Sequence, residues 1–166
     1  YEAQPGLLTV DTLILDLFGQ RFYNRAGMQV QVDSLGFNIL QAAIGNNGAW
    51  LSANGRANYD ETMDLQLLLN DIPMKPWKNL FAESLMVDGL LSCEASITGS
   101  FMQPEFILNA QTDSLVYEDL LLGDVATSLV YGDRLLNIVN FQLLSGYGDY
   151  RAEGSFYVDL AFTADS

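Results

Sequence analysis

The stretch GLLSCEASITGSFM, residues 89–102, decides the fold class, because every second position in it is apolar or small. One set of alternate residues reads G, L, C, A, I, G, F, and the other reads L, S, E, S, T, S, M. Successive side chains of a β-strand point to opposite faces of the sheet, so this period of two indicates a strand with one apolar and one largely polar face. The stretch therefore predicts a half-buried strand.

The same alternation occurs at several other places along the chain. Residues 49–60 and 63–70 show it on either side of an Asp60-Glu61 turn, which predicts a hairpin. Residues 150–160 repeat it near the end of the chain. Shorter strands are expected at 7–18, 27–33, 105–113, 124–131 and 134–144, separated by Gly-rich or acidic turns at 45–48, 132–133 and 146–149.

One segment departs from this pattern. In residues 75–85 (KPWKNLFAESL), large apolar side chains recur at helical spacing, which predicts a short helix or a loop that caps the sheet. Pro73 and Pro76 would end any strand before it. We therefore expect an all-β protein of about ten strands, with this segment as its one non-strand element.

The strands favour an elongated, curved sheet. A strand of twelve residues spans about 40 Å, which is longer than a small sandwich needs. Small residues such as Ala53, Gly55, Ala95 and Gly154 interrupt the apolar faces, where a packed core would hold larger side chains. They fit either the floor of an open groove or sharp bending and close packing against a facing sheet, and the sequence alone does not separate these explanations.

Composition restricts the function. The 166 residues, 49% of them hydrophobic, suffice for one domain, 1–166, and no apolar run is long enough to span a bilayer. The formal net charge of −14 repels phosphate backbones, which argues against nucleic acid as a partner and against docking on anionic lipid head groups. The chain begins with Tyr1 rather than Met, so we expect a fragment of a longer protein, with any membrane anchor outside it.

No catalytic site, metal site or cofactor is expected. The sequence contains no histidine, the usual base for serine and cysteine nucleophiles and a common zinc ligand. Its one cysteine, Cys93, lies on the apolar side of the pattern, as a buried inert thiol does. The dispersed acidic residues read as a solvated face, and the tyrosines and tryptophans as core or rim residues rather than a sugar-binding platform.

Three segments resemble the carboxy-terminal region of the TamB family, the large component of the translocation and assembly module, within the wider AsmA-like group. They are 88–106, with a glycine-led strand, a Gly turn and a proline that starts the return strand; 117–125, similar to the family's link into the next hairpin; and 152–160, similar to the strand that closes a repeat. In the last segment Tyr157 stands where the family more often has proline. The likeness covers most of the chain, chiefly residues 48–162.

The resemblance implies a β-taco, a folded sheet with an apolar interior. It implies a periplasmic location, as part of a protein anchored in the inner membrane, and a partner of the BamA type in the outer membrane. The implied function is lipid transfer between the two membranes, with acyl chains in the groove. The residues expected to line that groove are Leu51, Ala53, Gly55, Leu65, Leu67, Leu91, Ala95, Ile97, Phe106, Leu108, Leu129, Phe156 and Val158.

Two alternatives stay open. The chain could be an assembly factor that offers sheet edges to strands of outer-membrane or secreted proteins by β-augmentation. It could also be a closed β-sandwich with an ordinary core and no ligand, since alternation often reflects only a core.

Overall fold

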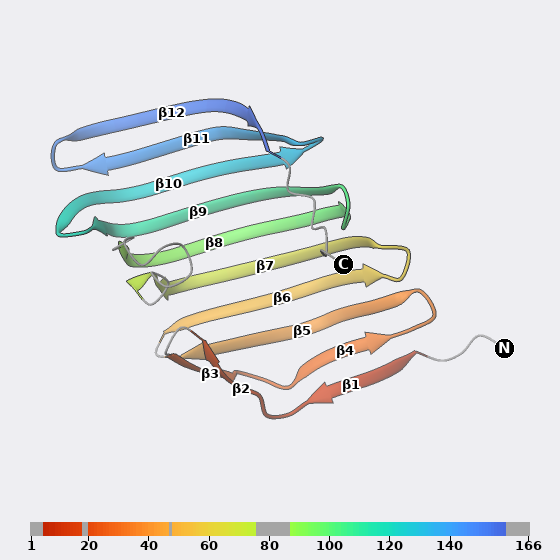
Figure 1. The fold of residues 1–166 in the computed structure, drawn as a ribbon. Helices are drawn as coiled ribbons and strands as arrows, with labels where there is room; N and C mark the ends of the chain where they lie inside the picture. The colour runs from red at the N-terminus through yellow and green to blue at the C-terminus, as the bar shows by residue number, and fades with distance from the viewer. Residues whose placement is uncertain (1–4, 18–19, 47, 76–86, 159–166) are drawn as a thin grey trace.

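The computed structural model describes residues 5–17, 20–46, 48–75 and 87–158. The described chain forms one antiparallel sheet (Figure 1). Its strands are β1 (Gly6–Val10), β2 (Ile14–Leu17), β3 (Gln20–Asn24), β4 (Met28–Val32), β5 (Gly36–Asn46), β6 (Ala49–Asn58), β7 (Thr62–Pro73), β8 (Val87–Ser100), β9 (Pro104–Tyr117), β10 (Leu120–Gly132), β11 (Leu135–Ser145) and β12 (Gly148–Tyr157).

From β4 onward the sheet is an up-and-down meander in which each strand pairs with its neighbours in sequence. The order across the sheet is β1-β4-β5 and then each strand in turn to β12. The short strands β2 and β3 pair with each other and leave this path, and β3 makes a brief pairing with the end of β5. The all-β, open and curved sheet expected from the sequence is thus confirmed.

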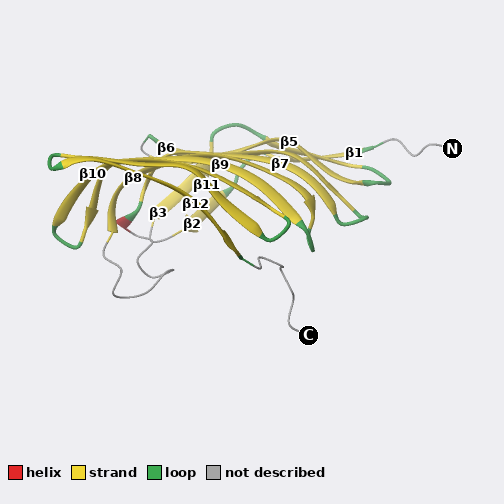
Figure 2. Ribbon diagram, turned by 90° about the horizontal axis from the view of Figure 1, so that it is seen from above, coloured by secondary structure: helices red, strands yellow, loops and turns green. Residues whose placement is uncertain are grey.

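The sheet is strongly arched (Figure 2), and the β2–β3 hairpin lies under the arch. The bend coincides with β-bulges, each of which places two residues opposite one and increases the local twist. Such register shifts occur at Leu40-Gln41 in β5, Asn70-Asp71 in β7 and Val139-Asn140 in β11. Asp71 takes a φ of 51° there, in the left-handed region that Asp tolerates better than most residues.

Gly55 shows why one of the small residues is small. Its φ is 120°, and a Cβ at this position would lie 2.1 Å from the carbonyl oxygen of Asp64 on β7. Glycine is the residue that accommodates both this backbone conformation and this close approach. At Gly55, therefore, the bend of the sheet accounts for the missing side chain, whereas a Cβ at Gly154 would meet nothing within 4 Å.

The best-buried apolar cluster lies where the β2–β3 hairpin folds over the sheet. Phe22 on β3 is only 5% exposed and packs with Ile44, Ala49 and Ile72 from β5, β6 and β7. Leu13 and Leu15 on the hairpin, and Leu51 and Leu69 on the sheet, surround this cluster. Among the described residues, this hairpin is the largest element that covers the sheet, and no second sheet faces it.

The structure differs from the sequence-based expectation in two details. The described residues form twelve strands rather than the expected ten or so. The expected strand 7–18 is divided into β1 and β2 at residues 11–13, and β3 and β5 were not predicted. The expected helix or cap at 75–85 lies outside the described residues, apart from Lys75.

Candidate functional site: an apolar face that spans the sheet

The strand register gathers the apolar residues onto one side of the sheet, which we call the apolar face. Residues directly opposite each other in an antiparallel pair point to the same side, so the pairings trace rows across the strands. Three rows form the centre of the apolar face. The first row is Leu8, Val30, Ile39, Gly55, Leu65, Ile97, Phe106, Tyr131, Leu136 and Phe156.

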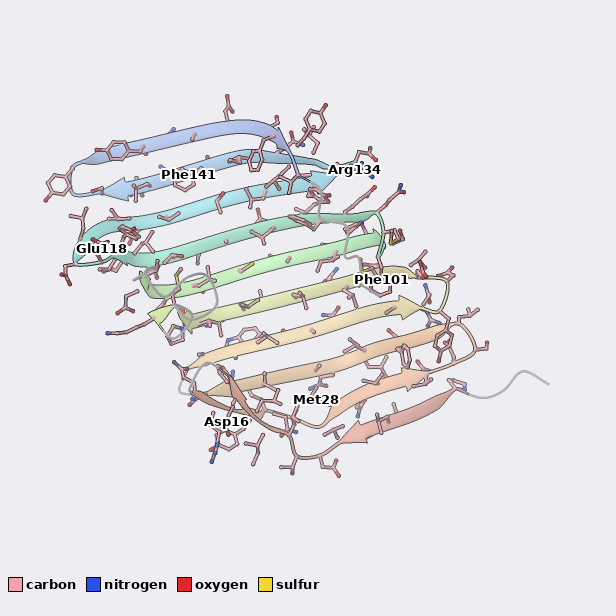
Figure 3. All side chains as sticks on the ribbon, viewed as in Figure 1. Asp16, Met28, Phe101, Glu118, Arg134 and Phe141 are labelled. Carbon is pink, nitrogen blue, oxygen red and sulfur yellow. The ribbon has the colours of Figure 1, made fainter. Side chains whose placement is uncertain are left out.

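The second row is Ala42, Ala53, Leu67, Ala95, Leu108, Leu129, Ile138 and Gly154. The third is Ile44, Leu51, Leu69, Cys93, Ala110, Thr127, Phe141 and Ala152. Leu91 starts a shorter row, with Thr112, Val125, Leu143 and Tyr150. Figure 3 shows the side chains along the strands, with Phe141 labelled on β11.

All the predicted lining residues from Leu51 to Phe156 fall in these rows. The remaining one, Val158, directly follows β12, where its amide donates to the carbonyl oxygen of Arg134 and its carbonyl accepts from the Tyr131 hydroxyl. The structure therefore brings the predicted residues together on one surface.

The apolar face carries no charge along these rows. Its threonine hydroxyls have partners within the protein: Thr127 donates to the carbonyl oxygen of Asn140 at 3.0 Å, and Thr112 lies 3.8 Å from the sulfur of Met74. The Tyr131 hydroxyl donates to Val158 at 3.2 Å. Because these polar groups are satisfied, the face presents mainly hydrocarbon.

The sheet is a single layer, but its arch shields the side chains of the apolar face from solvent. Ala95 is 8% exposed, and the other residues of the central rows from β6 to β11 are buried or half-buried. Their neighbours on the opposite side are more exposed, as Ile107 at 54% shows. The apolar face is therefore the concave side, the same side that the β2–β3 hairpin covers at β5 to β7.

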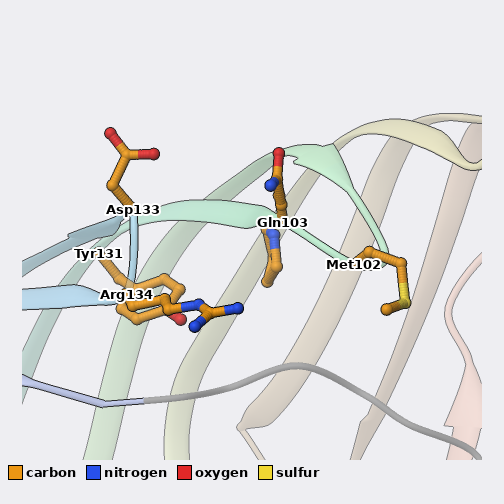
Figure 4. Close-up of a pocket in the computed structure, with 6 residues that line it drawn as sticks. Met102, Gln103, Tyr131, Asp133 and Arg134 are labelled. Atoms are coloured by element: carbon orange, nitrogen blue, oxygen red, sulfur yellow. The ribbon is translucent and has the colours of Figure 1, made fainter.

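Away from the β2–β3 hairpin, two aromatic rings lie on the concave side at β9 and β10. The rings of Phe106 and Tyr131 stack there, with centroids 5.0 Å apart. A pocket of about 210 Å³ adjoins Tyr131 and is lined also by Met102, Gln103, Asp133 and Arg134 (Figure 4). With one acidic and one basic residue at its rim, the pocket does not select a ligand by charge.

The convex face is largely polar, with exposed apolar residues such as Ile107, and hydrogen bonds link its side chains. Arg56 on β6 binds Asp33 through two hydrogen bonds of 2.7 and 2.9 Å from its Nη2 atom, and the amides of Leu35 and Gly36 donate to the same carboxylate. These contacts, with the Arg56 guanidinium contributing most, hold the pKa of Asp33 below its ordinary value. They fix the β4–β5 turn to β6 and stabilise the sheet from its convex side.

Cys93 lies on the apolar face as expected, but its thiol is half-buried rather than buried. Burial, with a smaller contribution from the Glu94 charge, raises its pKa, so the reactive thiolate is disfavoured. Within the described residues, no group of three His, Cys, Asp or Glu side chains could hold a metal ion.

Sequence reasoning did not identify the part of the apolar face on β5 and β11. On β11, Ile138 and Phe141 share the face although they are three residues apart, because the bulge at Val139-Asn140 changes the phase of alternation. Ile39 and Ala42 on β5 are related in the same way. A search for alternation that allows one extra residue would have found both.

No helix among the described residues has the length and apolar character needed to cross a membrane. Comparison of the chain with protein-family models, curated proteins and solved structures finds no match.

Proposed function

We propose that the chain is a scaffold that binds lipid acyl chains on its apolar face and serves lipid transfer between the inner and outer membranes of a cell envelope. The observation that carries the proposal is the uncharged, concave apolar surface that runs from β4 to β12. At about 4.8 Å per strand, the eight spacings between these strands span about 38 Å. A surface of this length and shape suits flexible hydrocarbon chains better than a compact polar ligand.

The energetics support binding that is strong but not specific in position. Burial of one methylene group contributes about 0.8 kcal/mol, so a chain of about sixteen carbons gains on the order of 12 kcal/mol before the cost of ordering it. The face has few polar groups to fix an orientation. A chain can therefore shift along the rows at little cost, which suits movement of lipid over the surface.

The charge distribution favours head groups in water. Charged side chains such as Arg56, Asp64 and Glu105 lie on the convex side, in register with one another across the strands. An acyl chain on the concave side therefore avoids them. The resemblance to the TamB family supports the same assignment, together with the periplasmic location and the BamA-type partner that it implies.

Two neighbouring residues of β9 provide a matched test. Leu108 lies on the apolar face, and Ile107, next to it, lies on the convex face. We would load the delipidated chain with a fluorescent sixteen-carbon fatty acid or with neutral phosphatidylcholine vesicles, and measure bound lipid by fluorescence and native mass spectrometry. Leu108→Glu should reduce binding at least about ten-fold, because a buried carboxylate must be desolvated beside the hydrocarbon chain. Ile107→Glu should bind like the wild type.

Circular dichroism and urea unfolding would confirm that both variants are folded. If the folded Leu108→Glu variant binds as much lipid as Ile107→Glu, the apolar face is not the lipid site. Transfer is tested separately, by the rate at which the chain moves labelled lipid between donor and acceptor vesicles. Binding without transfer would restrict the proposal to lipid storage.

The exposed strand at the end of the sheet supports the alternative function, that of an assembly factor for other β-proteins. All ten residues of β12 are exposed, and among the described residues it pairs with β11 alone, so its outer edge can accept a further strand. Site-specific photocrosslinking from Ser155, on the edge, and from Leu108, on the apolar face, separates the two functions. Client strands would crosslink to the edge, and lipid to the face.

A further inference from the structure

The strand β12 lies at one edge of the described sheet. Among the described residues β12 pairs with β11 only, and the sequence GDYRAEGSFY contains neither proline nor lysine. The bulge in this pair lies on β11, which leaves β12 regular. Natural sheets protect edges with proline, with charged side chains, lysine above all, or with a bulge in the edge strand. Of these β12 carries Asp149, Arg151 and Glu153, whose mixed charges repel a strand of like charge and admit one of complementary charge. The edge of β12 is therefore suited to pairing.

The hydrogen-bond pattern shows which backbone groups face outward. In a regular antiparallel ladder, hydrogen-bonded and non-hydrogen-bonded pairs alternate along the strand. The Val158 amide donates to the Arg134 carbonyl at 2.9 Å, so the even-numbered residues of β12 direct their amides and carbonyls toward β11. The residues that direct them toward the open edge are Asp149, Arg151, Glu153, Ser155 and Tyr157.

We propose that a second copy of this chain pairs with β12 at this edge, antiparallel and symmetric about Ala152. In a new ladder, residues whose backbone groups point to the open edge must lie opposite residues of the same kind in the other copy. In a symmetric pair the two-fold axis therefore passes through a residue of β12 and not between two residues. Centring on Arg151 or Glu153 sets like charges against each other. Centring on Ala152 sets Arg151 opposite Glu153 of the other copy, twice over.

The apolar face supports the same register. Tyr150 comes opposite Gly154 of the other copy, where a side chain meets nothing in the single chain. An aromatic residue that covers a glycine on the neighbouring strand is a known device for stabilising sheet edges. Ala152 meets its own counterpart, so the apolar faces of the two copies join without a charge between them.

The exposed tyrosines agree with this arrangement. Tyr147 and Tyr157 are each 84% exposed in the single chain. In the register about Ala152, Tyr157 lies next to the turn between β11 and β12 of the second copy, which carries Tyr147. Both rings would lose part of their exposure there, which favours association.

Net charge sets the conditions for this association. Two copies of charge −14 repel each other, but at physiological ionic strength the Debye length is about 8 Å and the repulsion is largely screened. The contacts across β12 act at shorter range. The dimer should therefore form near physiological salt and dissociate when the salt concentration is lowered.

Disulfide trapping tests the register. In a Cys93→Ser background, Ala152→Cys should form a disulfide-linked dimer under mild oxidation, because residues at a non-hydrogen-bonded pair lie about 4.5 Å apart at Cα, within disulfide range. The control is Gly154→Cys, whose cysteine would face Tyr150 and should crosslink far less. Equal crosslinking of the two variants would overturn the register.

Charge exchange tests the interface without crosslinking. Analytical ultracentrifugation would compare the wild type with Arg151→Glu, Glu153→Arg and the double variant, over a range of about 1 to about 100 µM. Each single variant should raise the dissociation constant at least about ten-fold, and the double variant should restore it. Glu94→Arg on β8 makes the same charge change away from the edge and should still dimerise.

Two outcomes would contradict the proposal. A wild-type chain that is monomeric throughout this range at physiological salt does not use β12 for self-association, and its edge is left to a strand of another protein. Oligomers that grow beyond the dimer would mean that β12 pairs with a different edge, such as β1, in a head-to-tail manner.

Discussion

Phe106 and Tyr131 stack across β9 and β10 with their rings 17° from parallel, and Tyr131 also donates a hydrogen bond to Val158, beyond the end of β12. One side chain thus joins three parts of the sheet, at the end of the apolar face opposite to the β2–β3 hairpin. The stack lies on the concave surface, and the hydrogen bond holds Val158, just after β12, against Tyr131.

Two substitutions of Tyr131 should therefore separate the contributions of its hydroxyl group and of its ring to stability. Tyr131→Phe keeps the stack and loses the hydroxyl, which should lower the free energy of unfolding by about 1 kcal/mol. Tyr131→Ala also removes the buried ring and should cost about 3 to 5 kcal/mol. Urea unfolding monitored by circular dichroism measures both, and equal losses for the two variants would show that the ring contributes nothing.

Gly55 should not tolerate a side chain. Gly55→Ala forces a Cβ against the Asp64 carbonyl in a left-handed backbone conformation, and we expect a loss of about 2 kcal/mol or more. Gly132→Ala is the matched control on β10, because a Cβ there would make ordinary contact with Glu105 at 3.6 Å. It should change stability by less than about 1 kcal/mol. Thermal unfolding of the two variants, side by side, decides this.

The Asp33–Arg56 pair should make stability depend on pH. The pKa of Asp33 is lowered in the folded chain, chiefly by Arg56, so its contribution is present above its unfolded pKa and is lost as the pH falls through the lowered value. Asp33→Asn should reduce the loss of stability between about pH 5 and about pH 2. The urea midpoint as a function of pH is the measurement.

Asp16, which binds Arg21, provides the comparison for this effect. The pKa of Asp16 is also lowered, by its hydrogen bond with Arg21, but both side chains are about 60% exposed, against about 30% for Asp33 and Arg56. Solvent screens the exposed pair more. Asp16→Asn should therefore change the pH profile less than Asp33→Asn, and the reverse order would contradict this reasoning.

Phe22 should account for much of the stability of the hairpin cover. Phe22→Ala removes a ring that is 5% exposed among Ile44 and Ile72, and we expect a loss of about 3 to 5 kcal/mol. Phe37→Ala removes a ring of the same size that is 45% exposed, and should cost about 1 kcal/mol. Similar losses from both would mean that the hairpin does not depend on this contact.

Cys93 reports directly on the apolar face. Because burial raises the pKa of its thiol, alkylation at about pH 8 should be several-fold slower in the folded chain than in urea. Lipid bound on the apolar face should slow the alkylation of Cys93 further, and Leu108→Glu should abolish this protection by lipid. Alkylation rates followed by mass spectrometry test both statements, and a folded rate equal to the unfolded rate would contradict the first.

Alternation was clearest in β6, β8 and β12 and in β7 before its bulge, and it also located β11 although a bulge interrupts the period of two there. The hairpin of β6 and β7 was identified on both sides of Asp60-Glu61, and Glu61 takes the positive φ of 70° expected at such a turn. β5 was missed because the bulge at Leu40-Gln41 moves its apolar residues to the opposite phase. Five residues are too few for β3 to show a pattern, and its role depends on Phe22 reaching a distant part of the sheet.

The lining residues were predictable as members of an apolar pattern, but not as members of one surface. Leu51 and Phe156 belong to strands at different places in the sheet, and the register of every intervening pair is needed to show that they share a face. The sequence also did not show whether the sheet is open or closed, since an arched open sheet and a sandwich contain the same alternation. Curvature arises from bulges and close glycine contacts, which depend on the neighbouring strand.

From β4 onward, the substantial contacts between strands join only sequence neighbours. Such a meander behaves as a nearly one-dimensional system, in which unfolding can begin by fraying at either end while the middle hairpins persist. Length then becomes an adjustable property: insertion of one more hairpin would extend the hydrocarbon track by about 10 Å without a change in any other contact. Evolution could thus match this architecture to the distance it has to cover, one pair of strands at a time.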